Sequence, residues 1–203
     1  DLTLPEFLMA YPENNTFLNA WSVNISWFVD DMRFSCVDVY VNGTLICSSG
    51  EYSSHIMYAE DPSLDFGSWI IELIAVDRAG NKAFWKTVVY VDTASPTITY
   101  SPQNNTIANT SIRLTIGVLD DSYNYTHVII MVGGSTIEQT YRAPTINLTF
   151  PDEGEYRIII MSFDMAGNNA SVTLHYIIDL TLPEFLMAYP ENNTFLNAWS
   201  VNI

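Results

Sequence analysis

The chain repeats itself. Residues 179–203 are identical to residues 1–25, which gives a period of 178 residues. Inside this period, YVDTASPTITYSPQNNTIANTSIRLTIGVLDDS at 90–122 parallels the opening of the chain, and AVDRAGN at 75–81 parallels SFDMAGN at 162–168. We therefore expect module one at 1–91, module two at 92–178, and the start of another copy of module one at 179–203. Each module has to build its own core from about 90 residues.

Apolar and polar residues alternate along several segments of both modules. This period of two predicts strands with one buried face, and no segment keeps helical spacing over three turns. The Asn42-Gly43 pair after one such segment predicts a tight hairpin turn. We expect six or seven strands per module and an all-β fold of two tandem β-sandwiches. The residues expected to point inward are Val23, Ile25, Trp27, Val29, Val37, Val39, Val41, Ile112, Leu114, Ile116 and Val118.

Short motifs add a family resemblance. The segment DEGEY at 152–156 precedes the apolar run RIIIMSFD, and DFGSW at 65–69 stands at the matching place in module one. D-x-G-x-Y before a late strand resembles the tyrosine corner of immunoglobulin-like domains, although Trp69 replaces the tyrosine in module one. Together with the D-x-A-G-N hairpins, the pattern is similar to tandem immunoglobulin-like repeats of bacterial and archaeal cell-surface and filament proteins. That resemblance implies a stalk or filament role.

The charge balance excludes some partners. The net charge is −16, with two lysines and five arginines, so few side chains can neutralise nucleic-acid phosphates or anionic lipids. No apolar run approaches the roughly 20 residues that a membrane helix needs. An acidic surface attracts divalent cations, and it also keeps molecules apart by repulsion.

Asparagine sequons are unusually frequent. Eight of the thirteen asparagines in residues 1–178 begin an Asn-X-Ser/Thr triplet, and none of the eight has proline in the middle. Turn-forming residues can meet by chance, as in Asn42-Gly43-Thr44, but Asn24 and Asn147 lie inside alternating segments. We therefore expect N-linked glycans and an extracellular or cell-surface location. The candidate sites are Asn14, Asn24, Asn42, Asn104, Asn109, Asn124, Asn147 and Asn169, with Asn192 in the closing copy.

The two cysteines lie on either side of the expected hairpin. With a two-residue turn at Asn42-Gly43, Asp38 falls opposite Cys47, and Cys36 becomes a diagonal neighbour of Cys47. Because an extracellular location favours oxidation, we expect a Cys36–Cys47 disulfide.

Carboxylates should collect at one end of each module. In an immunoglobulin-like sandwich the chain entry and two of the loops meet there, which would gather acidic and amide side chains suited to calcium. The alternative is that Asp77 and Asp164 cap the D-x-A-G-N turns. We expect calcium at Asp92, Asp121 and Asp164 if any metal binds, and no other cofactor. The full sets are Asp92, Asp120, Asp121, Asp164 and Asn168 in module two, and Asp1, Asp30, Asp31, Asp77 and Asn81 in module one.

Catalytic motifs are missing from the sequence. His55, His127 and His175 fall on different segments, and none lies beside a serine or cysteine placed to act as a nucleophile. We interpret all three as structural and expect no enzymatic activity.

One outward face of module two is expected to be apolar. If Tyr156, Ile158 and Ile160 point inward, the residues between them point out, whereas module one has Asp38, Tyr40 and Glu72 at matching places. A contact with another module or chain would bury such a face, although a loop or a glycan could also cover it. The predicted contact residues are Ile129, Met131, Ile159 and Met161.

These features favour a non-catalytic repeat unit of a glycosylated extracellular filament, stalk or surface layer, with further copies in line and lateral self-association. Two alternatives stay open. The chain could be an adhesin module that recognises glycans or another cell surface, or an accessory module of a large secreted enzyme. Many near-identical periods in the gene would favour the filament, whereas few periods and a distinct tip domain would favour adhesion.

Overall fold

The computed structural model describes residues 2–59 and 66–184, and these residues form two β-sandwiches. Within them there is no helix with the length and apolarity to cross a membrane. The strands of module one are β1 (Glu6–Tyr11), β2 (Thr16–Leu18), β3 (Ser22–Asp30), β4 (Phe34–Val41), β5 (Thr44–Ser49), β6 (Ser53–Ala59), β7 (Phe66–Asp77) and β8 (Lys82–Asp92). Those of module two are β9 (Thr97–Ser101), β10 (Thr106–Ala108), β11 (Ile112–Leu119), β12 (Tyr123–Val132), β13 (Ser135–Tyr141), β14 (Thr145–Phe150), β15 (Gly154–Asp164) and β16 (Asn169–Ile178).

Each module pairs a three-stranded sheet with a five-stranded sheet. In module one the orders are β1-β3-β6 and β2-β8-β7-β4-β5, and in module two they are β9-β11-β14 and β10-β16-β15-β12-β13. Pairing is antiparallel except between β2 and β8 and between β10 and β16. The first strand of each module is therefore split between the two sheets. A cis peptide bond lies at the point where the strand is split, Tyr11–Pro12 in module one and Ser101–Pro102 in module two.

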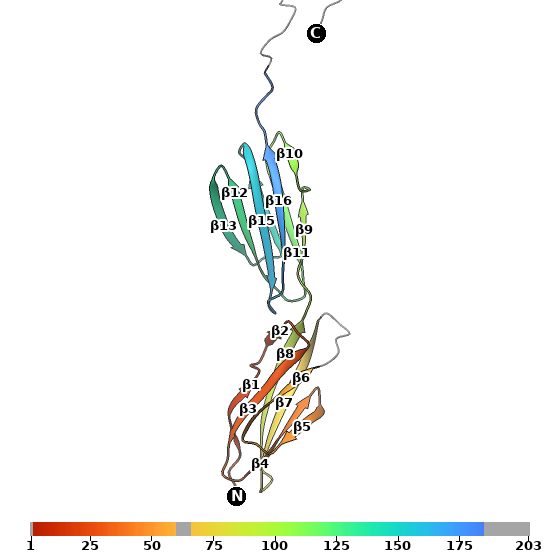
Figure 1. Ribbon diagram of the computed structural model, residues 1–203, viewed down its shortest axis with the longest axis vertical. Coiled ribbons are helices and arrows are strands. Elements are labelled where there is room, and N and C mark those ends of the chain that lie inside the picture. The colour runs from red at the N-terminus through yellow and green to blue at the C-terminus, as the bar shows by residue number, and fades with distance from the viewer. Residues whose placement is uncertain (1, 60–65, 185–203) are drawn as a thin grey trace, which may run out of the picture.

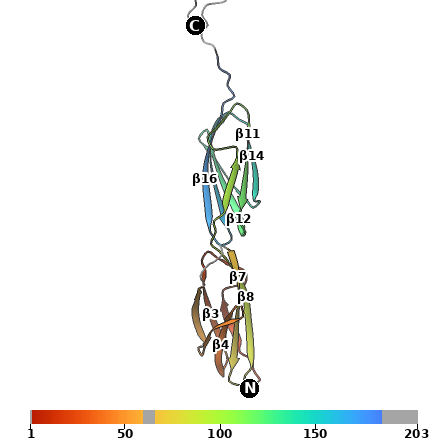
Figure 2. The same cartoon turned by 90° about the vertical axis from the view of Figure 1, so that its right-hand side faces the viewer.

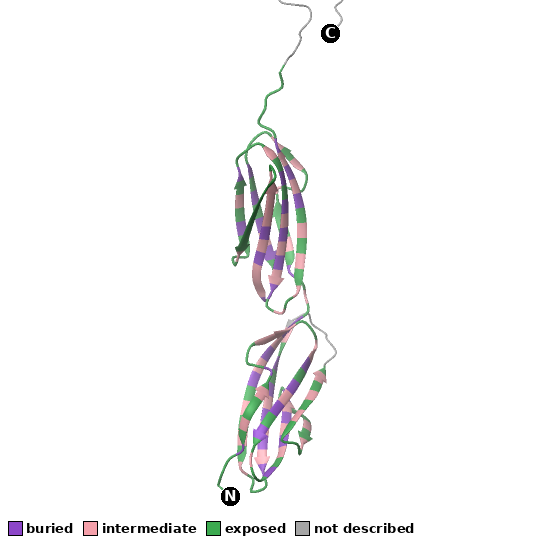
Figure 3. Cartoon of the chain, turned by 60° about the vertical axis from the view of Figure 1, so that its left-hand side comes forward, coloured by how far each residue is buried: buried purple, intermediate pink, exposed green. Residues whose placement is uncertain are grey.

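The core follows the predicted alternation (Figure 3). Along β3 the side chains of Ile25 and Trp27 have no exposed surface, whereas those of Asn24 and Phe28 face solvent. All eleven residues predicted to point inward are buried. Apolar burial of this kind contributes roughly 1.5–3 kcal/mol for each large side chain, which is what holds a sheet pair together. The prediction of two tandem immunoglobulin-like sandwiches is confirmed.

The two sandwiches lie end to end (Figures 1 and 2). The chain enters each module at one end and leaves it at the other, and β8 of module one runs directly toward the entry of module two (Figure 1). Strand β8 extends to Asp92, the residue at which we expected module two to begin. Residues 179–184 continue past the far end of module two without a strand, and the rest of the closing copy, with Asn192, lies outside the described residues.

The register shifts at four places among the described residues, and the alternation did not predict two of these β-bulges, in β1 and in β5. In β1 the pairing with β3 shifts between Phe7 and Met9, which accommodates the one residue by which the segment from Pro5 to Pro12 exceeds that from Pro96 to Pro102. In β5 the shift leaves Ile46 as an extra residue. A one-residue shift reverses the face of every side chain beyond it, so the second bulge bears directly on the cysteines.

Candidate functional site

The junction between the modules is built around Asp92. This residue is 1% exposed although it carries a carboxylate. Its carboxylate accepts hydrogen bonds from the backbone amide of Ala94, at 3.1 Å, and from the hydroxyl of Ser122. Its backbone carbonyl accepts a bond of 2.7 Å from the side-chain amide of Asn168. The last residue of β8 is therefore held by two separate loops of module two.

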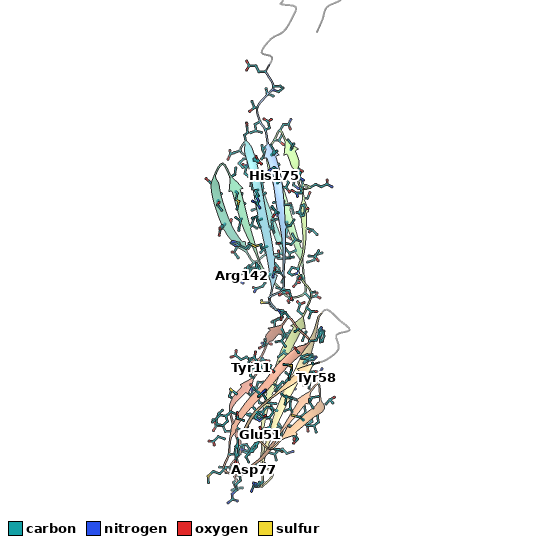
Figure 4. The ribbon with its side chains drawn as sticks, viewed as in Figure 1. Tyr11, Glu51, Tyr58, Asp77, Arg142 and His175 are labelled. Carbon is teal, nitrogen blue, oxygen red and sulfur yellow. The ribbon has the colours of Figure 1, made fainter. Side chains whose placement is uncertain are left out.

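The D-x-A-G-N hairpins supply one of these loops. Asp164 accepts bonds from the backbone and side-chain nitrogens of Asn168, at 2.8 and 2.7 Å. Asp77 is bound in the same way by Asn81, whose side chain also donates a 3.1 Å bond to the carbonyl of Thr3. Figure 4 shows Asp77 at the end of module one where the chain begins. In both modules the hairpin therefore closes its own turn and fastens the incoming chain, and the prediction that Asp77 and Asp164 cap these turns is confirmed.

The junction also gathers three carboxylates. One oxygen each of Asp92, Asp120 and Asp164 lie within 4.8 Å of one another, and this is the one such group found among the described residues. Asp121 is exposed and stands outside the group, so Asp120 takes the place that we predicted for it. In module one Asp30 is exposed, Asp31 accepts a 2.6 Å bond from the Arg33 amide, and Asp1 lies outside the described residues.

The pKa of Asp120 is raised at the junction, whereas that of Asp77 is lowered in the hairpin of module one. Burial raises the pKa of Asp120, and the negative charges of Asp92, Asp164 and Asp121 raise it further, against a hydrogen bond from the Ser122 amide. For Asp77, burial also acts to raise the pKa, but bonds from Asn81, Ala79 and Gly80 outweigh it and hold the pKa below its ordinary value.

The three junction carboxylates offer oxygen donors at a spacing that suits calcium. However, both oxygens of Asp92 and of Asp164 already accept protein hydrogen bonds. Calcium at these carboxylates therefore stays the untested alternative to the capping role.

The tyrosine corner forms in module two. The hydroxyl of Tyr156 donates a 2.9 Å bond to the carbonyl of Asp152, and the ring packs against Phe150 at 4.9 Å between ring centroids. In module one Trp69 is 1% exposed at the matching place and meets Trp21 and Tyr58 edge-on. Asp65 lies outside the described residues. The motif therefore fastens a loop with a hydroxyl in one module and fills the core with an indole in the other.

The sequon asparagines lie on the surface of both modules. Seven of the eight in residues 1–178 are exposed, and Asn124 is half-buried with its oxygen accepting a 3.3 Å bond from Arg142. Asn24, Asn147 and Asn169 stand on the outer faces of three different sheets. Their positions leave room for sugar, and glycosylation itself stays a prediction.

Three sequon asparagines also bind the backbone. The side-chain oxygens of Asn14, Asn42 and Asn104 accept bonds from the amides of Val88, Ile70 and His175, at 3.0, 2.9 and 2.7 Å. An N-linked sugar joins the side-chain nitrogen, so these bonds through the oxygen are compatible with a glycan. A structural role and a glycan can therefore coexist at these positions.

The cysteine prediction is wrong for this structure. The bulge at Ile46 places Cys47 opposite Val39 instead of Asp38, so Cys47 packs against the core while Cys36 stays on the outer face. Both thiols are free. Burial raises the pKa of Cys47, and the charge of Asp38 raises it further.

The histidines stand on outer sheet faces. His175 lies near the far end of module two (Figure 4), where Nε2 is 2.7 Å from an oxygen of Glu155. His127 lies 3.0 Å from the Thr140 hydroxyl and 3.6 Å from Glu138, and His55 is exposed on β6. The structural role of the three histidines stays a prediction.

The outward face of β12 and β15 carries the predicted apolar residues. Ile129, Met131, Ile159 and Met161 all point away from the core, as expected, but each is only half-exposed. We call this face the outer stripe, and it consists of Tyr125, His127, Ile129, Met131, Arg157, Ile159, Met161 and Phe163.

We expected the matching outer face of module one to be polar, and this expectation is wrong. Phe84 on β8 is 70% exposed and lies in register with Ile74 and Asp38 on the matching face of module one. On the opposite sheet Met57 is also 70% exposed. The alternation along β8 itself places Phe84 outward, next to the strands β4 and β7 that carry Asp38, Tyr40 and Glu72. Exposed apolar side chains therefore occur on both modules.

Comparisons with known proteins agree with the fold. No family model and no curated protein matches the chain. Among solved structures, the chain is similar to the fibronectin(III)-like modules of Clostridium thermocellum CbhA, with 19% identity, a TM-score of 0.52, and coverage of 92% of this chain and 100% of that one. It is also similar to immunoglobulin domains 1–5 of Sidekick-1, with 10% identity, a TM-score of 0.54, and coverage of 87% of this chain and 39% of that one. At such identities the likeness concerns the fold, and the chain consists of tandem domains of the immunoglobulin-like type.

Proposed function

We propose that the chain is a non-catalytic, N-glycosylated repeat unit of an extracellular filament, stalk or surface layer. The observation that carries this proposal is the opposite placement of entry and exit in each module, with Asp92 held by both loops at the junction. Modules of this kind can be joined in series without the chain changing direction. The sequence that follows module two repeats residues 1–25, so the next unit would begin as this one does.

The exit of module two also resembles its entry. Asp179 accepts a 3.0 Å bond from the amide of Thr181, as Asp92 accepts one from the amide of Ala94. The hydroxyl of Thr181 adds 3.0 Å bonds to the Glu153 carboxylate. This arrangement supports a second junction of the same type at the start of the next copy.

Glycans fit the same role. Sequon asparagines lie on the outer faces of both modules, where sugar would shield a long, exposed stalk and limit its lateral contacts. The surface that remains available for self-association would be the part of the outer stripe around Ile129, Met131 and Ile159.

Small-angle X-ray scattering tests the proposal by measuring the particle length of chains with one, two and four periods. A strand of 12 residues such as β7 spans about 40 Å, so each added period should lengthen the particle by roughly 80 Å. Mass spectrometry of intact glycopeptides from the native protein measures the sugar. Lengths that stop growing with added periods would contradict the stalk, and bare asparagines throughout would contradict the glycosylation.

A further inference from the structure

We infer that the sugar on Asn169 folds back onto an aromatic groove at the entry end of module two and covers it. This inference rests on the proposed glycosylation and names the surface that one particular glycan occupies. The groove has a volume of about 440 Å³ and is lined by Tyr125, His127, Thr140, Arg142, Met161 and Phe163. Figure 4 shows Arg142 at the end of module two that faces module one.

An aromatic pair forms one side of this groove. The rings of Tyr125 and Phe163 stack with their centroids 4.8 Å apart and their planes inclined by 21°. Both side chains lie on the outer face of the sheet and are half-exposed. An aromatic platform of this kind matches the apolar C–H face of a pyranose ring.

Polar groups surround the platform. His127 and Thr140 form one side, with 3.0 Å between Nδ1 and the hydroxyl, and Arg142 extends over another side toward Asn124. Hydrogen-bonding side chains around an apolar floor are what the hydroxyl groups of a sugar need. The lining therefore fits a carbohydrate better than an apolar side chain from another protein.

Asn169 stands next to this platform. It lies in register with Phe163, which in turn lies in register with Tyr125, so the three residues form one row across β16, β15 and β12. Side chains directly opposite each other on neighbouring strands have their Cβ atoms about 4.5–5.5 Å apart. The Asn169 side chain is exposed and begins the sequon Asn-Ala-Ser. A sugar on its nitrogen would lie beside the Phe163 ring without crossing any other strand.

A glycan on Asn169 would cover the end of the outer stripe that forms the groove, so this end need not bind a second chain. The glycan would cover Tyr125 and Phe163, and it would leave Ile129, Met131 and Ile159 in the rows beyond. Asn24 offers a matched comparison, because it is an exposed sequon asparagine on a strand but lies in register with Met57 instead of an aromatic ring.

Nuclear magnetic resonance of the glycosylated protein tests the contact. Protons of the first sugar on Asn169 should be shifted upfield by the Phe163 and Tyr125 rings and should show nuclear Overhauser effects to them, whereas sugar on Asn24 should show neither. Phe163→Leu keeps the apolar bulk and removes the nearer ring, so it should abolish the nuclear Overhauser effects to residue 163 and reduce the upfield shifts while glycan occupancy stays the same.

Thermal unfolding supplies the second measurement. Loss of one aromatic contact of ordinary strength corresponds to a Tm decrease of roughly 4–8 °C in a domain of this size. Asn169→Gln should lower the Tm of glycosylated module two by this amount. In the Asn169→Gln background, Phe163→Leu should then lower the Tm only as much as it does in protein made without glycans, where it removes the stacking on Tyr125 alone. In protein made without glycans, Asn169→Gln should leave the Tm unchanged.

The outcomes separate the two proposals. Asparagines that are bare at every sequon would overturn both the glycosylation and the contact. An occupied Asn24 with a bare Asn169, or an occupied Asn169 without ring-induced shifts, would overturn the contact and leave the repeat unit standing. Binding of free oligosaccharide to the groove of the glycosylated wild type would show that the groove recognises external sugar, which also overturns the inference.

Discussion

The side-chain amide of Asn168 donates a 2.7 Å hydrogen bond to the backbone carbonyl of Asp92, across 76 residues of sequence. Asn168 belongs to a hairpin of module two, and Asp92 is the last residue of β8 of module one. This bond connects the two modules directly, and Asp164 holds the donor in place through two further bonds.

Replacement of Asn168 should loosen the junction. Asn168→Ala removes the two side-chain bonds, to the Asp92 carbonyl and to Asp164, and keeps the backbone bond to Asp164. Module two should therefore lose about 1–3 kcal/mol of stability, and the angle between the modules should vary more widely. Paired spin labels, one on each module, measure the spread of distances. Asn81→Ala makes the same change in module one and should leave this distance distribution narrow. The Asn169 sequon remains intact in both variants. An unchanged distribution in Asn168→Ala would mean that Ser122 and the connecting segment hold the junction alone.

Acid should stabilise module two through Asp120. Because the pKa of Asp120 is raised in the folded state, the folded protein binds a proton more tightly than the unfolded chain does. Its contribution to stability therefore increases as the pH falls from the raised pKa toward about 3.9, the ordinary value, and decreases as the pH rises through that window. Asp120→Asn should remove this dependence, as followed by hydrogen exchange of module two.

The same variant tests calcium. Asp120→Asn creates an Asn-Asp-Ser sequon, so it has to be made without glycosylation. We expect chelator to leave the Tm of the wild type unchanged, because the oxygens of Asp92 and Asp164 already accept protein hydrogen bonds. A Tm that falls on addition of chelator in the wild type, but not in Asp120→Asn, would establish a calcium site at the junction.

The tyrosine corner should stabilise module two through one hydroxyl. Tyr156→Phe keeps the buried ring and leaves the Asp152 carbonyl without its 2.9 Å donor, which should cost about 1 kcal/mol. Tyr141→Phe is the control, because its hydroxyl bonds to Gln139 at an exposed position and should matter by less than about 0.5 kcal/mol. Equal effects of the two variants in hydrogen exchange would show that the corner carries no special stability.

Module one should become more stable when Thr87 loses its hydroxyl. Thr87 is 1% exposed, and its hydroxyl has no hydrogen-bond partner among the described residues. Thr87 pairs with Ile71, and Leu174 occupies the corresponding place opposite Ile158 in module two. Thr87→Val should therefore raise stability by about 1–2 kcal/mol, because it removes an unpaired polar group at nearly constant volume.

Tryptophan fluorescence measures this change selectively, since residues 92–178 contain no tryptophan. Ser53→Ala, which removes a hydroxyl at an exposed position on β6 of module one, should change stability by less than about 0.5 kcal/mol. A destabilised Thr87→Val protein would indicate that the hydroxyl has a partner.

Lateral association should depend on the outer stripe beyond the groove. Ile129 and Ile159 lie in register on β12 and β15, and replacement of both by aspartate places two charges where the proposed contact buries apolar surface. Chains of several periods should then sediment as single particles with unchanged circular dichroism, and the milder threonine pair should weaken association without dispersing it fully. Phe84→Asp, at the exposed matching face of module one, should leave association intact. Normal association of the aspartate pair would mean that another surface mediates the contact.

The sequence alone determined which residues of each strand face the core and where the main hairpin turns form. Alternation settles which side chains face the core, because successive residues of a strand point to opposite faces, as with Ile25 and Asn24. The Asn42-Gly43 turn and the capped D-x-A-G-N hairpins also follow from local chemistry, since each needs only residues within a few positions of one another.

Only the tertiary structure decided how the strands meet. The bulge at Ile46 moved Cys47 to the core side, and nothing within β5 itself marks that extra residue, because a bulge depends on the partner strand. At the junction it is Asp120, and not its neighbour Asp121, that lies close to Asp92 and Asp164. The course of the loop decides which of the two carboxylates faces them. The row of Asn169, Phe163 and Tyr125 exists only in the assembled sheet. These residues are 44 positions apart at most, and it is cross-strand register, which no local pattern contains, that places them side by side.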